Sequence, residues 1–263
     1  ITLLTLSRLL PKELDIKPLV EEAKAQLLAE ANYTLEAQYL ARYKNLLSTN
    51  PHFKVPSVYV EHSTAQVLTM EYVDAKPIEG ITYLPQSDRS RVAEQLIDLF
   101  FKEMFEFKLI QTDPNFANFH YQPESQKIVL FDFGATREIT ATLSDAYLAL
   151  FKAGSNNDRE GVLNAATAIG YFKDALKDDY KERVIDLFLM ACEPLRYNGE
   201  FDFKNSELAS NIKDAGLQLS TQSQQWHTPP VDALFIHRKL AGLYLIAARL
   251  EAKIDVKALF SHY

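Results

Sequence analysis

The sequence predicts an α+β protein in which a long helix and a β-hairpin precede a mostly helical lobe. Over residues 18–48 apolar side chains recur in four-residue steps, as one face of a helix requires. Two β-rich runs, 54–59 and 66–72, flank a polar turn, which is typical of an antiparallel hairpin. From residue 144 to residue 263 nearly every block has the pattern of an amphipathic helix.

The elements follow in order along the chain. The first helix is predicted to cover 18–48 without a break. In the hairpin, Pro56 makes the first run an edge strand or delays its start, because proline cannot donate to a ladder. The next helix is predicted to be capped by Ser87 or Asp88 and to run to about Lys108.

A second hairpin is predicted after this helix, where the turn QPESQ leads into the apolar strand KIVLF. The helical lobe then has breaks at GSNND, GYFKD, RYNGEFD and WHTPP. We find no internal repeat. We therefore expect two unequal lobes, residues 1–73 as a partial small lobe and residues 74–263 as a helical large lobe.

Composition excludes several classes of protein. The net charge is -7 and no Lys/Arg-rich run is present, so we do not expect a nucleic-acid partner. The most apolar long stretch, ALFIHRKLAGLYLIAARL, is interrupted by basic residues and should not span a membrane. Cys192 is the only cysteine, which excludes an internal disulfide and fits a free, buried thiol in a reducing compartment.

Three polar residues carry the candidate chemistry. Asn118 follows Asp113 by five positions, and Asp132 comes after the second predicted hairpin. Because a hairpin returns the chain beside its own start, Asn118 and Asp132 should meet at one end of the two strands. Their oxygen atoms suit Mg²⁺, which completes its octahedron with water and phosphate oxygens. Asp113 would face the reacting end, where a carboxylate orients or accepts a hydroxyl proton.

Asp-x-x-x-x-Asn followed at this distance by Asp-Phe-Gly is the arrangement of the catalytic and metal loops in protein-kinase-like enzymes. Turn chemistry alone explains each of the three residues but not their joint order. His120 lies on the same hairpin, and we interpret it as a strand residue rather than a metal ligand. Arg238, Lys239 and Arg249 leave two readings open, contact with anionic lipid head groups or a solvated or ion-paired face, and the second is favoured.

The segments QTDPNFANF and DFGATRE resemble the UbiB/ADCK group of atypical kinase-like proteins, which is tied to ubiquinone (coenzyme Q) biosynthesis. EANYTLEA is similar to the group's Glu-x-Asp/Asn helix motif, and PPVDALFIHRKLAGLYLIAARL is similar to its C-terminal helical region. The resemblance runs from roughly residue 10 to the end. It implies a protein-kinase-like fold with a truncated small lobe.

The resemblance also implies a role for each matching position. Asp113 falls at the catalytic aspartate, and Asn118 and Asp132 fall at the magnesium ligands. Glu36 falls where a helix glutamate pairs with a nucleotide-contacting lysine. The remaining implied nucleotide-side positions are Glu30 and Asn32 of the family motif and Met70, Glu71, Tyr72 and Val73 at the hinge that meets the adenine.

The chain also departs from the pattern. Its eight glycines lie far apart, so there is no Gly-rich phosphate loop, and the group's alanine-rich loop and Lys-x-Gly-Gln motif are missing. We expect the first strands of the fold to lie upstream of Ile1, and this chain alone to turn over poorly. Gln111 and Thr112 stand where ordinary protein kinases have His-Arg, and no Ala-Pro-Glu follows, so we do not expect a peptide kinase.

The sequence therefore predicts part of an atypical kinase or ATPase of the UbiB type, which binds Mg and ATP and supports ubiquinone biosynthesis. Expected partners are a nucleotide, an isoprenoid or lipid precursor, ubiquinone-biosynthesis enzymes and a peripheral membrane contact. Two alternatives stay open, a small-molecule phosphotransferase of the aminoglycoside or choline kinase type and a non-catalytic nucleotide-binding scaffold. The expected location is cytoplasmic at the bacterial inner membrane, or the mitochondrial matrix.

Overall fold

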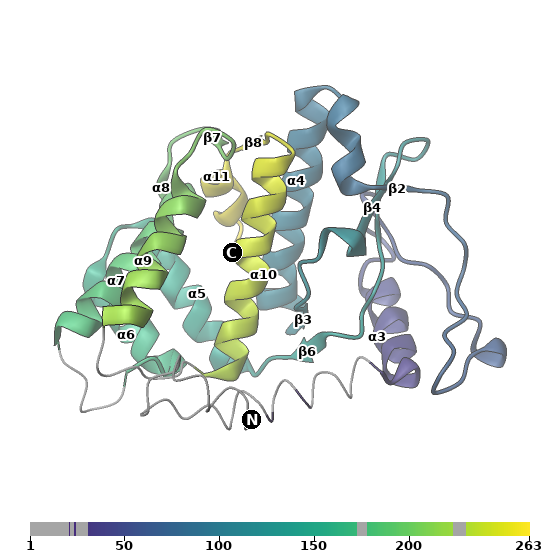
Figure 1. Cartoon of the computed structure of the whole chain (residues 1–263), viewed down its shortest axis with the longest axis horizontal. Coiled ribbons are helices and arrows are strands. Elements are labelled where there is room, and N and C mark those ends of the chain that lie inside the picture. The colour runs from purple at the N-terminus through teal and green to yellow at the C-terminus, as the bar shows by residue number, and fades with distance from the viewer. Residues whose placement is uncertain (1–20, 22–23, 25–30, 173–177, 223–229) are drawn as a thin grey trace.

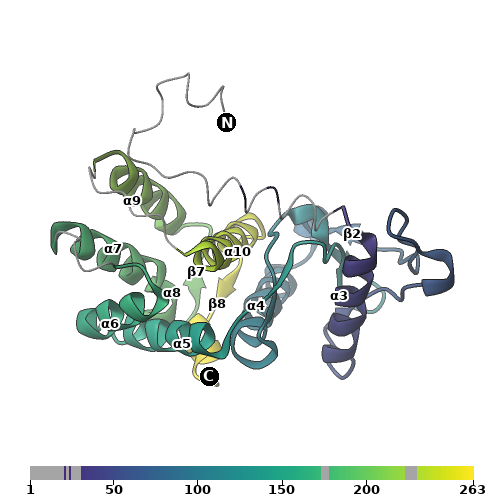
Figure 2. The ribbon, with the colours of Figure 1, turned by 90° about the horizontal axis from the view of Figure 1, so that it is seen from below.

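The computed structural model describes residues 21, 24, 31–172, 178–222 and 230–263. Figure 1 shows α3 and the strands β2 and β4 at one end of the molecule and the helices α5 to α9 at the other. Seen from below, α10 and α4 lie between these two groups (Figure 2). The expected α+β class is confirmed, and the division at residue 73 stays a prediction. Among the described residues, no helix has the length and apolarity that crossing a membrane requires.

The first fully described helix is α3, Tyr33–Leu46. It begins at Asn32, whose side-chain oxygen accepts a hydrogen bond of 3.3 Å from the Leu35 N–H. Such a cap satisfies one of the free donors of the first turn, so it starts a new helix. The prediction of one unbroken helix over 18–48 is therefore wrong at residues 31–32.

The predicted first hairpin is present as a backbone pairing rather than as two full strands. The Tyr59 N–H donates to the Thr69 carbonyl at 2.9 Å, and the Glu71 N–H donates to the Ser57 carbonyl at 2.7 Å. Residues Val60–His62 form a 3₁₀ turn, and the strand β1 is confined to Phe53–Lys54, before Pro56. Strand β1 pairs with β5, Lys127–Leu130, and the hairpin pairing begins at Ser57, after Pro56, in keeping with the delayed start expected of this proline.

Helix α4, Gln86–Lys102, continues into a π-helical turn, η3, at Glu103–Phe107. Its N-cap is Pro85, which makes no side-chain cap, and Ser87 and Asp88 lie inside the first turn. The predicted cap is therefore wrong. The predicted end is confirmed, because Lys108 adopts a left-handed conformation with φ of 50° and stops the helix.

The second predicted hairpin is confirmed. Strands β4, Phe119–Gln122, and β5, Lys127–Leu130, pair antiparallel with Phe119 opposite Leu130. They form the centre of a four-stranded sheet in the order β1-β5-β4-β2, where β2 is Lys76–Pro77. A separate antiparallel ladder joins the strand before this hairpin to the strand after it. These strands are β3, Leu109–Gln111, and β6, Thr136–Glu138.

The part of the chain predicted as the large lobe is built mostly from helices that share one hydrophobic core. Its elements are η2 Ile78–Tyr83, α5 Ala141–Ser155, α6 Arg159–Ile169, α7 Asp178–Ala191, α8 Glu193–Arg196, β7 Phe201–Asp202, α9 Leu208–Gln222, α10 Val231–Arg249, β8 Lys253–Ile254 and α11 Val256–Phe260. The predicted breaks after α5, α6 and α8 are confirmed, and most of WHTPP lies outside the described residues. Helix α10 buries Ile236, Leu243 and Ile246 in this core.

Candidate functional site

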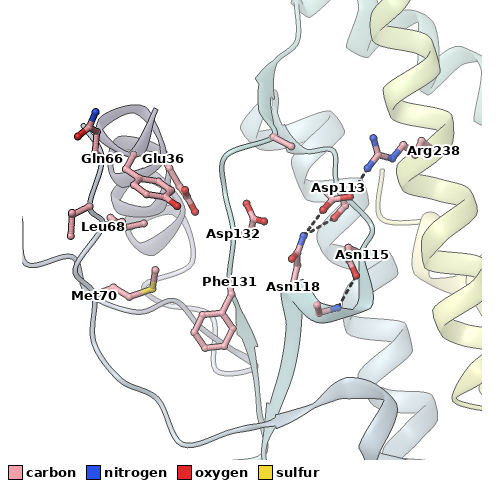
Figure 3. A pocket seen from close by; sticks show the side chains of 14 residues that line it. Glu36, Gln66, Leu68, Met70, Asp113, Asn115, Asn118, Phe131, Asp132 and Arg238 are labelled. Carbon is pink, nitrogen blue, oxygen red and sulfur yellow. Dashed lines mark hydrogen bonds and ion pairs between the residues drawn. The ribbon is translucent and has the colours of Figure 1, made fainter. Parts of the chain in front are cut away.

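A cleft of about 1090 Å³ opens between α3 and the β4–β5 hairpin. Figure 3 shows Glu36 of α3 on one side, Asp113 and Asn118 on the other, and Asp132 between them. The wall nearest α3 adds the side chains of Val67, Leu68 and Met70. The cleft thus has an apolar end and an end rich in carboxylate and amide groups.

Asp113 and Asn118 are brought together by a short 3₁₀ turn, η4, at Phe116–Asn118. Asn115 caps this turn, because its side-chain oxygen accepts a hydrogen bond of 3.1 Å from the Ala117 N–H. The Asn118 Nδ2 then donates to the Asp113 Oδ2 at 2.9 Å. Since its nitrogen is engaged, the amide oxygen is the atom of Asn118 that can bind a cation.

Asp132 follows β5 in a left-handed conformation, with φ of 59°. Its Oδ1 accepts a hydrogen bond of 3.1 Å from the Gly134 N–H, the local bond that lets an aspartate occupy this region. The Phe131 N–H donates to the Asn118 carbonyl at 2.9 Å, which holds the two ends of the hairpin together. Asn118 and Asp132 therefore lie at the same end of the strands, as the hairpin pattern predicts.

The donor set fits a hard cation. One carboxylate and one amide oxygen are ligands that Mg²⁺ prefers, and they leave room for water and phosphate oxygens. Within the part of the chain that the structure describes, no group of three or more His, Cys, Asp or Glu side chains could hold a metal. His120 packs its ring against Phe131 at 4.9 Å, and burial lowers its pKa, in keeping with a strand residue.

Glu36 reaches the start of the metal loop from α3. Its Oε1 accepts a hydrogen bond of 3.4 Å from the Phe133 N–H. Burial, and after it the nearby Asp132 carboxylate, raises the pKa of Glu36, while the Phe133 bond opposes this shift. No ion pair joins Glu36 to a lysine among the described residues. Its predicted pairing with a nucleotide-contacting lysine stays a prediction.

The implied hinge positions differ in where they point. Met70 lines the cleft. Glu71 forms an ion pair of 2.8 Å with Lys54, Tyr72 is 88% exposed to solvent, and Val73 is buried. Of the two family-motif residues, Asn32 caps α3 and Glu30 lies outside the described residues.

A buried polar network lies beneath the cleft. The Gln111 Nε2 donates to the carbonyl oxygens of Asp113, at 2.9 Å, and Asp132, at 3.2 Å, and so joins the two loops. The Lys239 Nζ donates to the Gln111 Oε1 at 2.9 Å and lies 3.8 Å from the Glu103 carboxylate. Glu103 also accepts a hydrogen bond of 2.8 Å from the hydroxyl of Tyr43 in α3. The network connects α10, η3 and α3 to the loops that line the cleft.

Burial dominates the electrostatics of this network. It raises the pKa of Glu103 and lowers the pKa of Lys239, and the mutual attraction of the two side chains opposes both shifts. Only 1% and 2% of these side chains are exposed. The pattern of the sequence favoured a solvated or ion-paired face for Lys239, and the structure shows the ion pair, inside the core.

Arg238 completes the polar end of the cleft. Its Nη2 lies 2.5 Å from the Asp113 Oδ1 (Figure 3), and its side chain is 49% exposed. One turn later on α10, Gly242 lies against Pro114 of the same loop. Residues 113 and 238 are 125 positions apart, so no local pattern pairs them. The only signal in the sequence was the basic pair at residues 238–239, which does not indicate which residues it contacts.

Three comparisons relate the chain to known proteins. Residues 1–166 match the ABC1 atypical kinase-like domain. The chain is 34% identical over 260 residues to the atypical kinase COQ8B, mitochondrial, of Rattus norvegicus, covering 99% of this chain and 49% of that protein. It is 32% identical over 261 residues to the atypical kinase COQ8, mitochondrial, of Saccharomyces cerevisiae, covering 98% and 52%. The chain thus spans about half the length of these curated relatives.

Among solved structures, the complex of Rv3197 with erythromycin from Mycobacterium tuberculosis has a similar fold. Its TM-score with this chain is 0.71 at 22% sequence identity, and the match covers 96% of this chain and 62% of that one. At this level of identity the likeness concerns the fold alone.

Proposed function

Because the chain belongs to the ABC1 atypical kinase-like family, we propose that this protein binds Mg-ATP in the cleft between α3 and the β4–β5 hairpin. The kinase-like fold and the resemblance to the UbiB/ADCK group are confirmed. The activity proposed for the whole protein is that of an atypical kinase or ATPase that supports ubiquinone biosynthesis.

One observation carries the proposal. Asp113, Asn118 and Asp132 converge on the polar end of a single cleft. Asn118 and Asp132 would hold Mg²⁺, which when bound neutralises charge on the phosphates. The Asp113 carboxylate would orient the hydroxyl of the acceptor or take its proton. The hydrogen bond from Asn118 keeps that carboxylate turned toward the same point.

The apolar end of the cleft supports the nucleotide assignment. Val67, Leu68 and Met70 line it across from Asp113 and Asn118. Apolar side chains beside a few polar groups are typical of ligand sites, and they suit the flat face of a base. We infer that the adenine lies against Met70, with its phosphates directed toward Asp132.

The acceptor and the setting follow from the family. Because Gln111 and Thr112 replace the His-Arg of peptide kinases and no Ala-Pro-Glu follows Asp132, water or a small molecule is the acceptor we propose, with an isoprenoid or lipid precursor as the organic candidate. The relatives named above are mitochondrial, which favours the mitochondrial matrix over the bacterial inner membrane. Peripheral membrane contact and assembly with ubiquinone-biosynthesis enzymes belong to the same proposal.

The test is the shift in melting temperature of the chain with ATP or ADP, measured with and without magnesium. A ligand present at 100 times its dissociation constant adds about 2.7 kcal/mol to the free energy of unfolding, which is readily seen. The shift should need magnesium and should disappear in Asp132→Asn. The matched control is Asp145→Asn, at an exposed position of α5 outside the cleft, which should keep it.

A nucleotide shift that survives in Asp132→Asn, or that ignores magnesium, would contradict the metal assignment. The absence of any shift, both in this chain and in the whole protein, would contradict a nucleotide site in these residues. Asp113→Asn separates binding from turnover, because it should retain the shift while ATP hydrolysis by the whole protein is lost.

A further inference from the structure

The charge of the cleft presents a problem for a triphosphate. Its lining contains three carboxylates, Glu36, Asp113 and Asp132, and among the described lining residues Arg238 is the only basic one. A nucleotide triphosphate adds several negative charges, of which one Mg²⁺ offsets two. Electrostatic stabilisation of transferring phosphates depends on fixed cations next to them.

The loop that carries Asp113 supplies no such cation. The four residues between Asp113 and Asn118 are Pro-Asn-Phe-Ala. Lys239, the basic neighbour of Arg238, is buried and engaged with Gln111 and Glu103 beneath the loop. Among the described residues that line the cleft, the cationic group at its reacting end is therefore the guanidinium of Arg238.

The backbone of Arg238 is held in place, whereas its guanidinium is accessible to solvent. Helix α10 is held at two points directly after Arg238, by Lys239 on Gln111 and by Gly242 on Pro114. The tip is half exposed and reaches the Oδ1 of Asp113, while Asn118 occupies the Oδ2. A guanidinium has five N–H donors, so one bond to Asp113 leaves others for phosphate oxygens.

We propose that Arg238 binds the terminal phosphate of the nucleotide, supplying from α10 the cation that the loop lacks. The inference rests on the proposed Mg-nucleotide site and adds the residue that distinguishes ATP from ADP there. Asp113 marks the reacting end, so the phosphate beside it is the transferring one. Arg238 acts on that group by direct contact and offsets the charge that develops on its oxygens.

The experiment compares the dissociation constants of Mg-ATP and Mg-ADP by titration calorimetry. Arg238→Met removes the guanidinium, keeps the length of the side chain, and should weaken Mg-ATP by about tenfold or more. The dissociation constant of Mg-ADP should change by less than about twofold, because ADP has no phosphate at the position of the terminal phosphate of ATP. The control is Arg249→Met, which alters the other arginine of α10 at an exposed position in its last turn and should change neither constant.

Arg238→Lys retains the charge but lacks the planar guanidinium. Its dissociation constant for Mg-ATP should lie between those of the wild type and Arg238→Met. If Arg238→Met lowers the melting temperature of the unliganded chain, Arg238→Lys replaces it as the test variant. Equal weakening of both nucleotides, or none, would overturn the inference while leaving the nucleotide site intact. If the wild type binds neither nucleotide, the proposed function fails first, and the inference that rests on it fails with it.

Discussion

Gly242 of α10 lies so close to Pro114 that a Cβ at residue 242 would be 2.1 Å from the Pro114 Cβ. Only a residue without a side chain lets the helix approach the loop to this distance. The contact sits one turn after Arg238, whose guanidinium reaches Asp113 of the same loop. The packing of one glycine therefore sets where the loop lies relative to α10.

We predict that Gly242→Ala destabilises the protein although alanine is the better helix former. The gain in helix propensity is at most about 1 kcal/mol, and overpacking at a rigid contact costs about 1–3 kcal/mol. Urea unfolding should show a lower midpoint, and Mg-nucleotide binding should weaken because the loop moves. Gly216→Ala in α9, where a Cβ meets nothing within 4 Å, is the matched control and should leave the midpoint unchanged or raise it. A Gly242→Ala variant as stable as the wild type would count against this role of the contact.

We predict that Lys239→Met lowers the free energy of unfolding by about 3–5 kcal/mol, because it leaves the Glu103 carboxylate buried without its cation. The double variant Lys239→Met, Glu103→Gln should recover most of that loss, since no charge is then left in the core. Chemical unfolding of the four proteins in a double-mutant cycle measures the coupling. If the two effects simply add, the buried pair does not act as a unit.

His237 predicts how stability depends on pH. Its ring lies between the hydroxyls of Tyr147 and Tyr171, each at 3.1 Å, and burial lowers its pKa to about 4. The unfolded chain binds a proton near pH 6.5, whereas the folded chain does not until about pH 4. The contribution of neutral His237 to the free energy of unfolding is therefore fully present above pH 6.5 and is lost as the pH falls toward 4.

Between pH 7.5 and pH 5 this group should lower the free energy of unfolding by about 2 kcal/mol. His237→Gln should show a correspondingly flatter profile in urea unfolding across this range, whatever its stability at pH 7.5. His62→Gln, at an exposed position, is the control and should keep the slope of the wild type. Equal slopes in wild type and His237→Gln would mean that the imidazole takes up its proton in the folded state.

Cys192 should be nearly inert in the folded protein. It is 2% exposed in the core of the large lobe, and burial raises the pKa of its thiol to about 12, so almost no thiolate forms at neutral pH. We predict labelling by a thiol reagent many orders of magnitude slower than for the unfolded chain. The measurement is the labelling rate with and without denaturant. Reaction at the rate of an exposed thiol under native conditions would show that the helices around Cys192 open readily.

The parts of the fold that the sequence predicted depend on short-range patterns. The β4–β5 hairpin was predictable because its turn and its apolar strand are contiguous, and a hairpin brings its own ends together. Its register then places Asn118 and Asp132 at one end of the strands. The helical breaks were visible for the same reason, since glycine and polar clusters mark them locally.

The features that were missed depend on competing local caps or on distant contacts. The break at Asn32 was hidden because the apolar steps continue through it, although asparagine is a strong N-cap residue. Pro85, rather than Ser87 or Asp88, precedes α4, as proline suits a helix start. The contacts of Arg238 and Lys239 with the loop span more than 120 residues, and no periodicity encodes them.

The attachment of α3 bears on how the cleft can move. Its Glu36, near the start of the helix, accepts from the Phe133 N–H. Near its end, Arg42 pairs with Glu138 at 2.5 Å and the Tyr43 hydroxyl donates to Glu103, so the helix is tied to the rest of the molecule at two places along its length. We expect a helix held in this way to keep its place when the cleft opens. Opening should instead involve residues 57–72, whose amides should exchange with solvent faster than those of α3.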